Sequence, residues 1–210
     1  MSETPLEIVL ATGNRGKIHE FEILFANMPV ILKSFETMKI KKPEIREYGK
    51  TFRENSIIKA SETAKLFNLP AIADDSGLAV TALNGAPGVF SARYAGEDAS
   101  DKANNLKLLE NMAGIIDRSA KFLCVIAVAK PDGDVLTFEG VCKGKILNSE
   151  KGNSGFGYDP LFWYPPLKKT FAQLTVVEKN KVSHRGKAIA ALASDIGSVI
   201  KWLTPHSFRT

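Results

Sequence analysis

Two adjacent carboxylates, Asp74 and Asp75, follow a short apolar run and precede Ser76 and Gly77. Buried carboxylates are costly unless a cation pairs with them, and Mg²⁺ takes hard oxygen ligands and often bridges a carboxylate to a substrate phosphate. Side chains alternate between the faces of a strand, so only one of the pair needs to face such a site. The pair indicates either a magnesium site or an acidic turn capped by Ser76, and alone it does not separate the two.

A glycine-containing turn lies where an apolar run gives way to a helical pattern, and it reads Thr12-Gly13-Asn14-Arg15-Gly16-Lys17. Free backbone N–H groups at a helix start, with a lysine nearby, suit a phosphate. The turn is not a P-loop, because Ala11 and Ile18 stand where that motif requires a glycine and a Ser or Thr. Alone, it is more typical of a plain strand-to-helix turn.

A second glycine-rich turn reads Ser154-Gly155-Phe156-Gly157-Tyr158-Asp159-Pro160. Glycines on both sides of Phe156 let a flat ligand approach the ring, and stacking of a base on an aromatic ring contributes about 1–3 kcal/mol. The alternative is a loop whose aromatics enter the core, which fits Phe162 and Trp163 better than Phe156.

Further on, His184 and Arg185 open the last helix. Their donors suit a carbonyl on a base, although an isolated pair of this kind is usually surface.

The elements that must position these residues alternate between strand and helix patterns. Apolar runs predict strands over 6–12, 29–35 and 71–74, the last broken by Ser76-Gly77, and the turn Pro131-Asp132-Gly133 joins antiparallel strands over 122–129 and 135–141. Helical periodicity predicts helices after Gly13, over 51–67, over 100–112 with Leu106 and Leu109 facing inward, and from an N-cap at Ser183. Residues 39–50 are charged and unpatterned, which indicates a loop. The mixture predicts an α/β or α+β domain around a mixed sheet.

Composition places the 210-residue chain among ordinary globular proteins, with 44% hydrophobic and 24% charged residues. The net charge of +5 implies attraction for anions. The basic residues form scattered pairs that are not interleaved with aromatics, so no nucleic-acid partner is expected. No apolar run approaches the roughly 20 residues of a membrane span, so no membrane partner is expected. Two cysteines, Cys124 and Cys142, are interpreted as small buried hydrophobes, and a cytoplasmic location is expected.

Taken together, the motifs resemble the inosine triphosphate pyrophosphatase family, the non-canonical purine nucleoside triphosphate pyrophosphatases. They occur in the family's order from residue 11 to about residue 187, and Asp74-Asp75-Ser76 resembles the bacterial branch. Asn84 and Ser154 stand where glycine is expected. The matching stretches are Thr12 to Lys17, Ala73 to Leu78, Gly85-Ala86-Pro87-Gly88, Ser91-Ala92-Arg93-Tyr94, Phe156 to Pro160, Glu178-Lys179 and Ser183-His184-Arg185.

The resemblance implies a single pyrophosphatase domain over residues 1–210. The implied fold is α/β (mixed α+β): an elongated central mixed sheet flanked by helices, with two lobes enclosing an active-site cleft. It further implies a homodimer, with Pro87 and Phe90 near its interface or Phe90 in the core. The implied reaction is hydrolysis of ITP, dITP and XTP to the nucleoside monophosphate and pyrophosphate, with Mg²⁺ as cofactor.

The resemblance also implies a role for each matching residue. Glu47 and Asp75 would bind Mg²⁺, with Glu44 the alternative to Glu47, and Asp75 would orient or deprotonate water. Asp74 would lie outside the metal's ligands, supporting Asp75 or a second ion. Ser76 would touch the substrate and Phe156 would stack on the base. Thr12, Asn14 and Lys17 would hold the triphosphate, with Lys59 as a further contact, and the base would be surrounded by Asp159, Lys179, His184 and Arg185. The other implied substrate-binding residues are Gly13, Arg15, Gly16, Gly157 and Tyr158.

Two rival interpretations differ from this one in substrate or in class. The Maf-like nucleotide pyrophosphatases share the fold and prefer other bases, but the segment Ser183-His184-Arg185 argues against them. A basic nucleic-acid-binding protein would explain the net charge. It would not explain Asp74 and Asp75 beside a turn suited to phosphate, because carboxylates repel a phosphodiester backbone.

Overall fold

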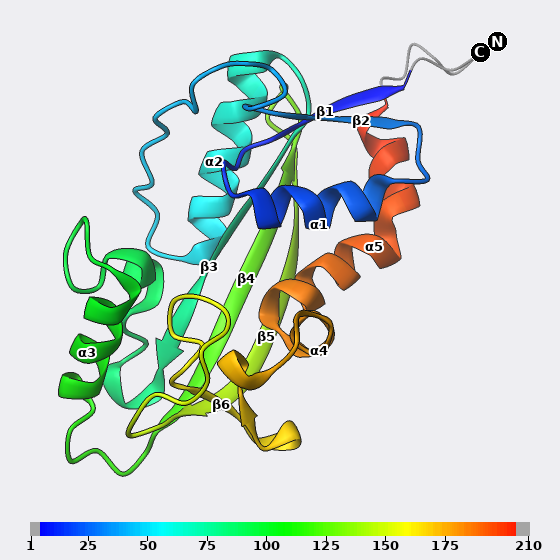
Figure 1. The fold of residues 1–210 in the computed structure, drawn as a ribbon. Helices are drawn as coiled ribbons and strands as arrows, with labels where there is room; N and C mark the ends of the chain where they lie inside the picture. The colour runs from blue at the N-terminus through cyan, green and yellow to red at the C-terminus, as the bar shows by residue number, and fades with distance from the viewer. Residues whose placement is uncertain (1–4, 205–210) are drawn as a thin grey trace. The chain divides into compact units, whose positions relative to one another are not determined.

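The fold is given by a computed structural model that describes residues 5–204. Strands and helices alternate through the first part of the chain, and a helix is the last element described (Figure 1). The strands are β1 (Leu6–Leu10), β2 (Val30–Ser34), β3 (Ala71–Val80), β4 (Ser119–Ala129), β5 (Val135–Ile146), β6 (Phe162–Tyr164) and β7 (Lys169–Thr170). The helices are α1 (Arg15–Phe25), α2 (Phe52–Phe67), α3 (Asp101–Asn111), α4 (Val176–Val182) and α5 (His184–Leu203).

The strands form a seven-stranded mixed sheet in the order β2-β1-β3-β4-β5-β6-β7. Strand β1 pairs in parallel with β2 and with β3, whereas β6 pairs antiparallel with both β5 and β7. The hydrogen bond from the Lys130 N–H to the Asp134 carbonyl closes the predicted turn between β4 and β5. The mixed α/β class expected from the sequence is confirmed.

The chain divides into two compact units, each built from separate segments of sequence. The first unit comprises the described residues up to Asp75, Val125–Phe138 and those from Ile189 onward. The second comprises Ser76–Cys124 and Glu139–Ala188, so β3, β4 and β5 each contribute to both units. A single domain over residues 1–210, and a cleft enclosed by two lobes, stay predictions.

In the first unit, helices cover both faces of the strands. Figure 1 shows α2 on one face and α1, with the last turns of α5, on the other. On the α2 face, small side chains such as Ala71 and Ala73 of β3 pack against Ala60 and Ala64 of the helix. Small residues on both sides let the α2 backbone lie close to the sheet, so side chains near this contact are held in place.

The second unit is built around an aromatic cluster of Phe122, Phe162 and Phe171. The ring of Phe122 lies 4.6 Å from that of Phe162 and 5.7 Å from that of Phe171. Such offset or tilted pairs stabilise a core beyond the area they bury. Phe162 is fully buried, in agreement with the expectation that it enters the core. The cluster also includes Tyr158, so it supports the glycine-rich turn of residues 154–160 from inside.

Two sequence predictions about the elements are wrong. The strand over 71–74 does not break at Ser76-Gly77: β3 continues to Val80, because Leu78 and Val80 are buried and keep the apolar pattern going. Leu106 does not face inward. It is half exposed, and the buried face of α3 carries Leu108 instead.

Both cysteines are fully buried, as expected of small hydrophobes. Burial raises the pKa of the Cys142 thiol to about 11, which keeps it protonated and unreactive at neutral pH. Among the described residues, no helix is both long enough and apolar enough to span a membrane.

Candidate active site

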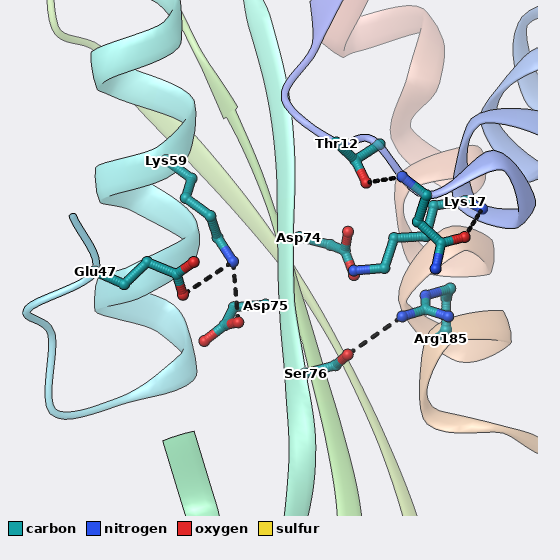
Figure 2. A network of polar contacts seen from close by, with 9 residues as sticks. Thr12, Lys17, Glu47, Lys59, Asp74, Asp75, Ser76 and Arg185 are labelled. Atoms are coloured by element: carbon teal, nitrogen blue, oxygen red, sulfur yellow. Dashed lines mark hydrogen bonds and ion pairs between the residues drawn. The ribbon is translucent and has the colours of Figure 1, made fainter. Parts of the chain in front are cut away.

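The two adjacent carboxylates of β3 lie on opposite faces of the strand, as the alternation of strand side chains requires. Figure 2 shows Asp74 directed toward Lys17 and Asp75 directed toward α2. The Asp74 carboxylate is buried and lies 2.8 Å from the Lys17 ammonium. Asp74 therefore pairs with the first turn of α1, and its role beside Asp75 or a second ion stays a prediction.

Asp75 belongs to a second group, formed with Lys59 of α2 and Glu47 of the preceding loop. The Lys59 ammonium lies 3.0 Å from Asp75 Oδ1 and 3.3 Å from Glu47 Oε2. Both carboxylates therefore converge on one cationic position (Figure 2). Glu44, the alternative to Glu47, is exposed and takes no part in this group. The geometry favours Glu47 as the partner of Asp75.

Burial and neighbouring charge act in opposite directions on these groups. Burial raises the pKa of the Asp75 carboxyl, and the Lys59 ammonium reduces that rise without cancelling it. For Lys59, burial lowers the pKa, but the Asp75 and Glu47 carboxylates outweigh burial, so the pKa lies above its ordinary value. A carboxylate with a raised pKa binds a proton more readily than an exposed one, which suits Asp75 to accept a proton from water.

The loop that carries Glu47 is held to α2 by Asn55, a residue that sequence reasoning missed. The buried Asn55 side chain accepts a hydrogen bond of 2.8 Å from the Gly49 N–H. A Cβ atom on Gly49 would lie 2.6 Å from Asn55 Oδ1, so only glycine allows this approach. In the sequence, this role is indicated only by the polar character of Asn55, which lies on the inward face of the helix predicted over residues 51–67.

The turn over residues 12–17 uses its own polar groups to start α1. Asn14 is the N-cap, and its Oδ1 accepts from the Lys17 N–H at 3.2 Å. Thr12 Oγ1 accepts from the Asn14 N–H at 3.1 Å, and exposed Arg15 pairs with Glu36. This is the capping pattern of a strand-to-helix turn, and it leaves the exposed backbone of Gly13 and Gly16 beside a helix N-terminus. Phosphate binding by this turn stays a prediction.

Magnesium fits the pair of Glu47 and Asp75. Among residues 5–204, no group of three or more His, Cys, Asp or Glu side chains is arranged to hold a metal ion. Mg²⁺ does not require one, because it is usually bound by one or two carboxylates together with substrate phosphates and water. Glu47 and Asp75 provide such hard oxygen donors, and both are held near one another by the Lys59 ammonium, at 3.3 and 3.0 Å.

In the second unit, Phe156 presents an exposed aromatic ring on the glycine-rich turn. Its side chain is 59% exposed, unlike the buried aromatics of the neighbouring cluster, so the ring is accessible to a planar ligand. The Lys179 ammonium lies 4.6 Å from the ring centroid and also pairs with buried Asp159. Burial raises the pKa of the Asp159 carboxyl, and Lys179 opposes that rise.

The glycine-rich turn is held from inside the second unit. Asp159 Oδ2 accepts from the Phe156 N–H at 3.0 Å. A Cβ atom on Gly155, whose φ is +84°, would lie 2.0 Å from the same oxygen, so glycine is required there. The Tyr158 phenol is buried and donates to the Ser91 carbonyl at 2.8 Å. Its side chain therefore belongs to the core, and only its backbone is left to serve a ligand.

Two residues of α3 complete this support, and sequence reasoning missed both. The Gly157 N–H donates to Asp101 Oδ2 at 2.6 Å, and the Asn105 amide donates to the Gly157 carbonyl at 3.2 Å. Both backbone groups of Gly157 are thus held by one helix. No local pattern links residues 101 and 105 to residue 157, so this contact is invisible without the fold.

His184 and Arg185 follow Ser183, whose hydroxyl accepts from the Gly186 N–H at 3.1 Å and so caps α5 as predicted. Arg185 Nη2 donates to Ser76 Oγ at 3.2 Å, which joins the helix start to β3 (Figure 2). His184 is buried and stacks on Phe122, with ring centroids 4.7 Å apart. Of the two, only Arg185 is partly accessible to a ligand.

The fold and these side chains define an α/β protein with paired carboxylates and lysines suited to an anionic ligand and a metal. A dITP/XTP pyrophosphatase from Desulfotalea psychrophila is 54% identical over 196 residues, which cover 93% of this chain and 87% of the relative. The model of the Ham1 family matches residues 8–195, and the chain belongs to this family. The resemblance seen in the motifs is confirmed.

Solved structures of Ham1 proteins have the same fold. The Ham1 protein from Staphylococcus aureus matches with a TM-score of 0.86 at 44% identity, over 92% of this chain and 99% of that one. A HAM1 protein from Coxiella burnetii matches with a TM-score of 0.87 at the same identity and coverage.

Proposed function

We propose that this protein hydrolyses the non-canonical purine nucleotides ITP, dITP and XTP to the nucleoside monophosphate and pyrophosphate. Residues 1–210 would act as one domain that removes these nucleotides from the cytoplasmic pool. The observation that carries the proposal is the convergence of Glu47 and Asp75 on the Lys59 ammonium, at 3.3 and 3.0 Å. The substrate class follows from the named activity of relatives such as the Desulfotalea psychrophila enzyme.

In the proposed reaction, water attacks the α-phosphorus and the bond to the bridging oxygen of the β-phosphate breaks. Asp75 orients the water and accepts its proton. Glu47 and Asp75 would hold Mg²⁺, which supplies charge neutralisation on the phosphate oxygens when bound. Lys59 keeps both carboxylates in position, and Lys17 with the turn over residues 12–17 contacts the triphosphate.

The base is proposed to stack on the exposed ring of Phe156. Lys179 and Asp159 fix the turn that presents this ring, and Arg185 supplies donors for a carbonyl oxygen of the base. Ser76 would contact the substrate from β3. The buried side chains of His184 and Tyr158 would act through packing, and the backbone of Tyr158 would face the ligand.

Pyrophosphate release from ITP, dITP, XTP, ATP and GTP tests the function directly. We expect kcat/KM for the first three to exceed that for ATP and GTP by about 100-fold or more, and we expect EDTA to remove the activity. Equal rates on all five nucleotides would contradict the proposed substrate class, and full activity in EDTA would contradict the proposed cofactor.

We further propose that the protein is a homodimer with Phe90 at or near its interface. Phe90 is 56% exposed, so it is not a core residue, whereas Pro87 is buried and has little surface left for a partner. Sedimentation at micromolar concentration should give about twice the 22.9 kDa chain mass. Phe90→Asp should shift the mass toward one chain, and Ile116→Asp, at a 97% exposed residue of the same unit, should not. A wild-type mass of 22.9 kDa would contradict the dimer.

A further inference from the structure

The lysines expected to bind phosphate already have carboxylate partners. Lys17 lies 2.8 Å from Asp74, and Lys59 lies between Asp75 and Glu47. With both lysines and all three carboxylates charged, this set has a net negative charge. A triphosphate carries about four negative charges, and one Mg²⁺ offsets only about half of them. Further cations are therefore needed beside Lys17 and Lys59 to offset the charge of the triphosphate.

A cavity of about 600 Å³ in the first unit supplies such cations. Its wall includes Glu47 and Lys59, so the cavity adjoins the proposed metal-binding pair. It also includes one further carboxylate, Glu44, and three cations, Lys41, Lys42 and Arg46, which we call the basic rim. The sequence indicated only an unpatterned charged loop over these residues, and the fold places all three on one concave surface.

The basic rim has no competing partners in the part of the chain that the structure describes. None of its three side chains forms an ion pair there, unlike Arg15, Lys17 and Lys59. All three are exposed to solvent and available to an anion. Lys42 also lies near the turn before α1, since a Cβ atom on Gly13 would lie 4.0 Å from Lys42 Cδ. The rim thus extends from that turn toward Glu47.

We propose that the basic rim binds the β- and γ-phosphates, the part of the substrate that leaves as pyrophosphate. This inference rests on the proposed function and adds residues to it. If the reacting α-phosphorus lies at Asp75, the cavity beyond Glu47 and Lys59 receives the rest of the triphosphate. Lysines are strong point charges for phosphate, and Arg46 adds a planar fork of donors. Cations placed there stabilise the charge that develops on the leaving pyrophosphate.

The test compares the two products as separate ligands. Calorimetry with Mg²⁺ measures the affinity of inorganic pyrophosphate and of IMP for the wild type, Lys42→Met and the double variant Lys41→Met/Lys42→Met. We expect pyrophosphate to bind about tenfold more weakly to Lys42→Met and weaker still to the double variant, with IMP binding changed less than about twofold. Lys50→Met removes an equal charge from the same loop outside the cavity, and both affinities should stay at the wild-type value.

An unchanged pyrophosphate affinity in the double variant would overturn the proposal. An equal loss for pyrophosphate and IMP would overturn it too, because the rim would then not distinguish the leaving group. The melting temperature of each variant shows whether folding is affected. If the wild type binds pyrophosphate through the rim but hydrolyses none of the five triphosphates, the proposed function fails, and the rim is a pyrophosphate-binding surface without a role in a leaving group. If the wild type hydrolyses ITP and the variants bind pyrophosphate normally, the proposed function stands and this inference fails.

Discussion

Asp75→Asn is expected to lower kcat by about 10²–10⁴-fold while the protein stays folded. The substitution keeps the size of the side chain and leaves an oxygen that can accept from Lys59. It removes the negative charge that would bind Mg²⁺ and the basic oxygen that would accept a proton from water. Steady-state kinetics over a Mg²⁺ titration should show that higher metal concentrations do not restore the rate.

Asp74→Asn is the matched variant, since it changes the same functional group one residue away. It weakens the ion pair with Lys17 on the other face of β3, so we expect a smaller loss that appears largely in KM. Circular dichroism and thermal melting check that both variants fold. Turnover by Asp75→Asn within about tenfold of the wild type would refute the catalytic assignment of Asp75.

Arg185→Ala is expected to lower kcat/KM for ITP by about 10–100-fold and that for ATP by less than about threefold. Hypoxanthine and xanthine carry an oxygen at the six position, where adenine carries an amino group. The Arg185 guanidinium has donors only, so it favours the oxygen and leaves the amino group without an acceptor. Guanine shares that oxygen, so GTP must be rejected through its two-amino group rather than by Arg185.

Lys181→Ala provides the control for Arg185→Ala. Lys181 is an exposed cation of α4 in the same unit, and its removal should leave the ratio between ITP and ATP unchanged. Arg185→Lys keeps the charge without the planar fork and should fall between the alanine variant and the wild type. An equal loss for ITP and ATP would mean that Arg185 acts on the phosphates or on the fold.

Most elements of the first unit could be predicted, because their patterns are local. The apolar stripe over residues 51–67 forms α2, with Thr51 as its N-cap, and the apolar runs form β1 and β2.

The prediction for α3, in the second unit, placed the wrong leucine inward because the buried face of that helix is partly polar. Asn104 and Asn105 are buried beside Leu108, and their amides hold backbone groups of other segments. Hydropathy cannot identify a face built in this way.

The candidate site was predictable only where each residue belongs to a short motif. Asp75, Phe156 and Arg185 could be selected on their chemistry and neighbours. The pairing of Lys17 with Asp74, and of Lys59 with Glu47, joins residues that are distant in sequence and depends on which face of β3 each helix covers. The basic rim could not be recognised, because a row of cations in a loop has the same sequence whether it lines a cavity or faces solvent.

The opposite orientation of Asp74 and Asp75 has a consequence for redesign and for natural variation. The two carboxylates are adjacent and identical in the sequence, yet Asp74 pairs with a lysine of α1 and Asp75 with a lysine of α2. Neither carboxylate can therefore replace the other. A screen for suppressors of Asp75→Asn should recover none at position 74. Deleting one residue within Ala71 to Ala73 would exchange the two faces and place each carboxylate before the wrong lysine. This short segment should therefore tolerate no change of length.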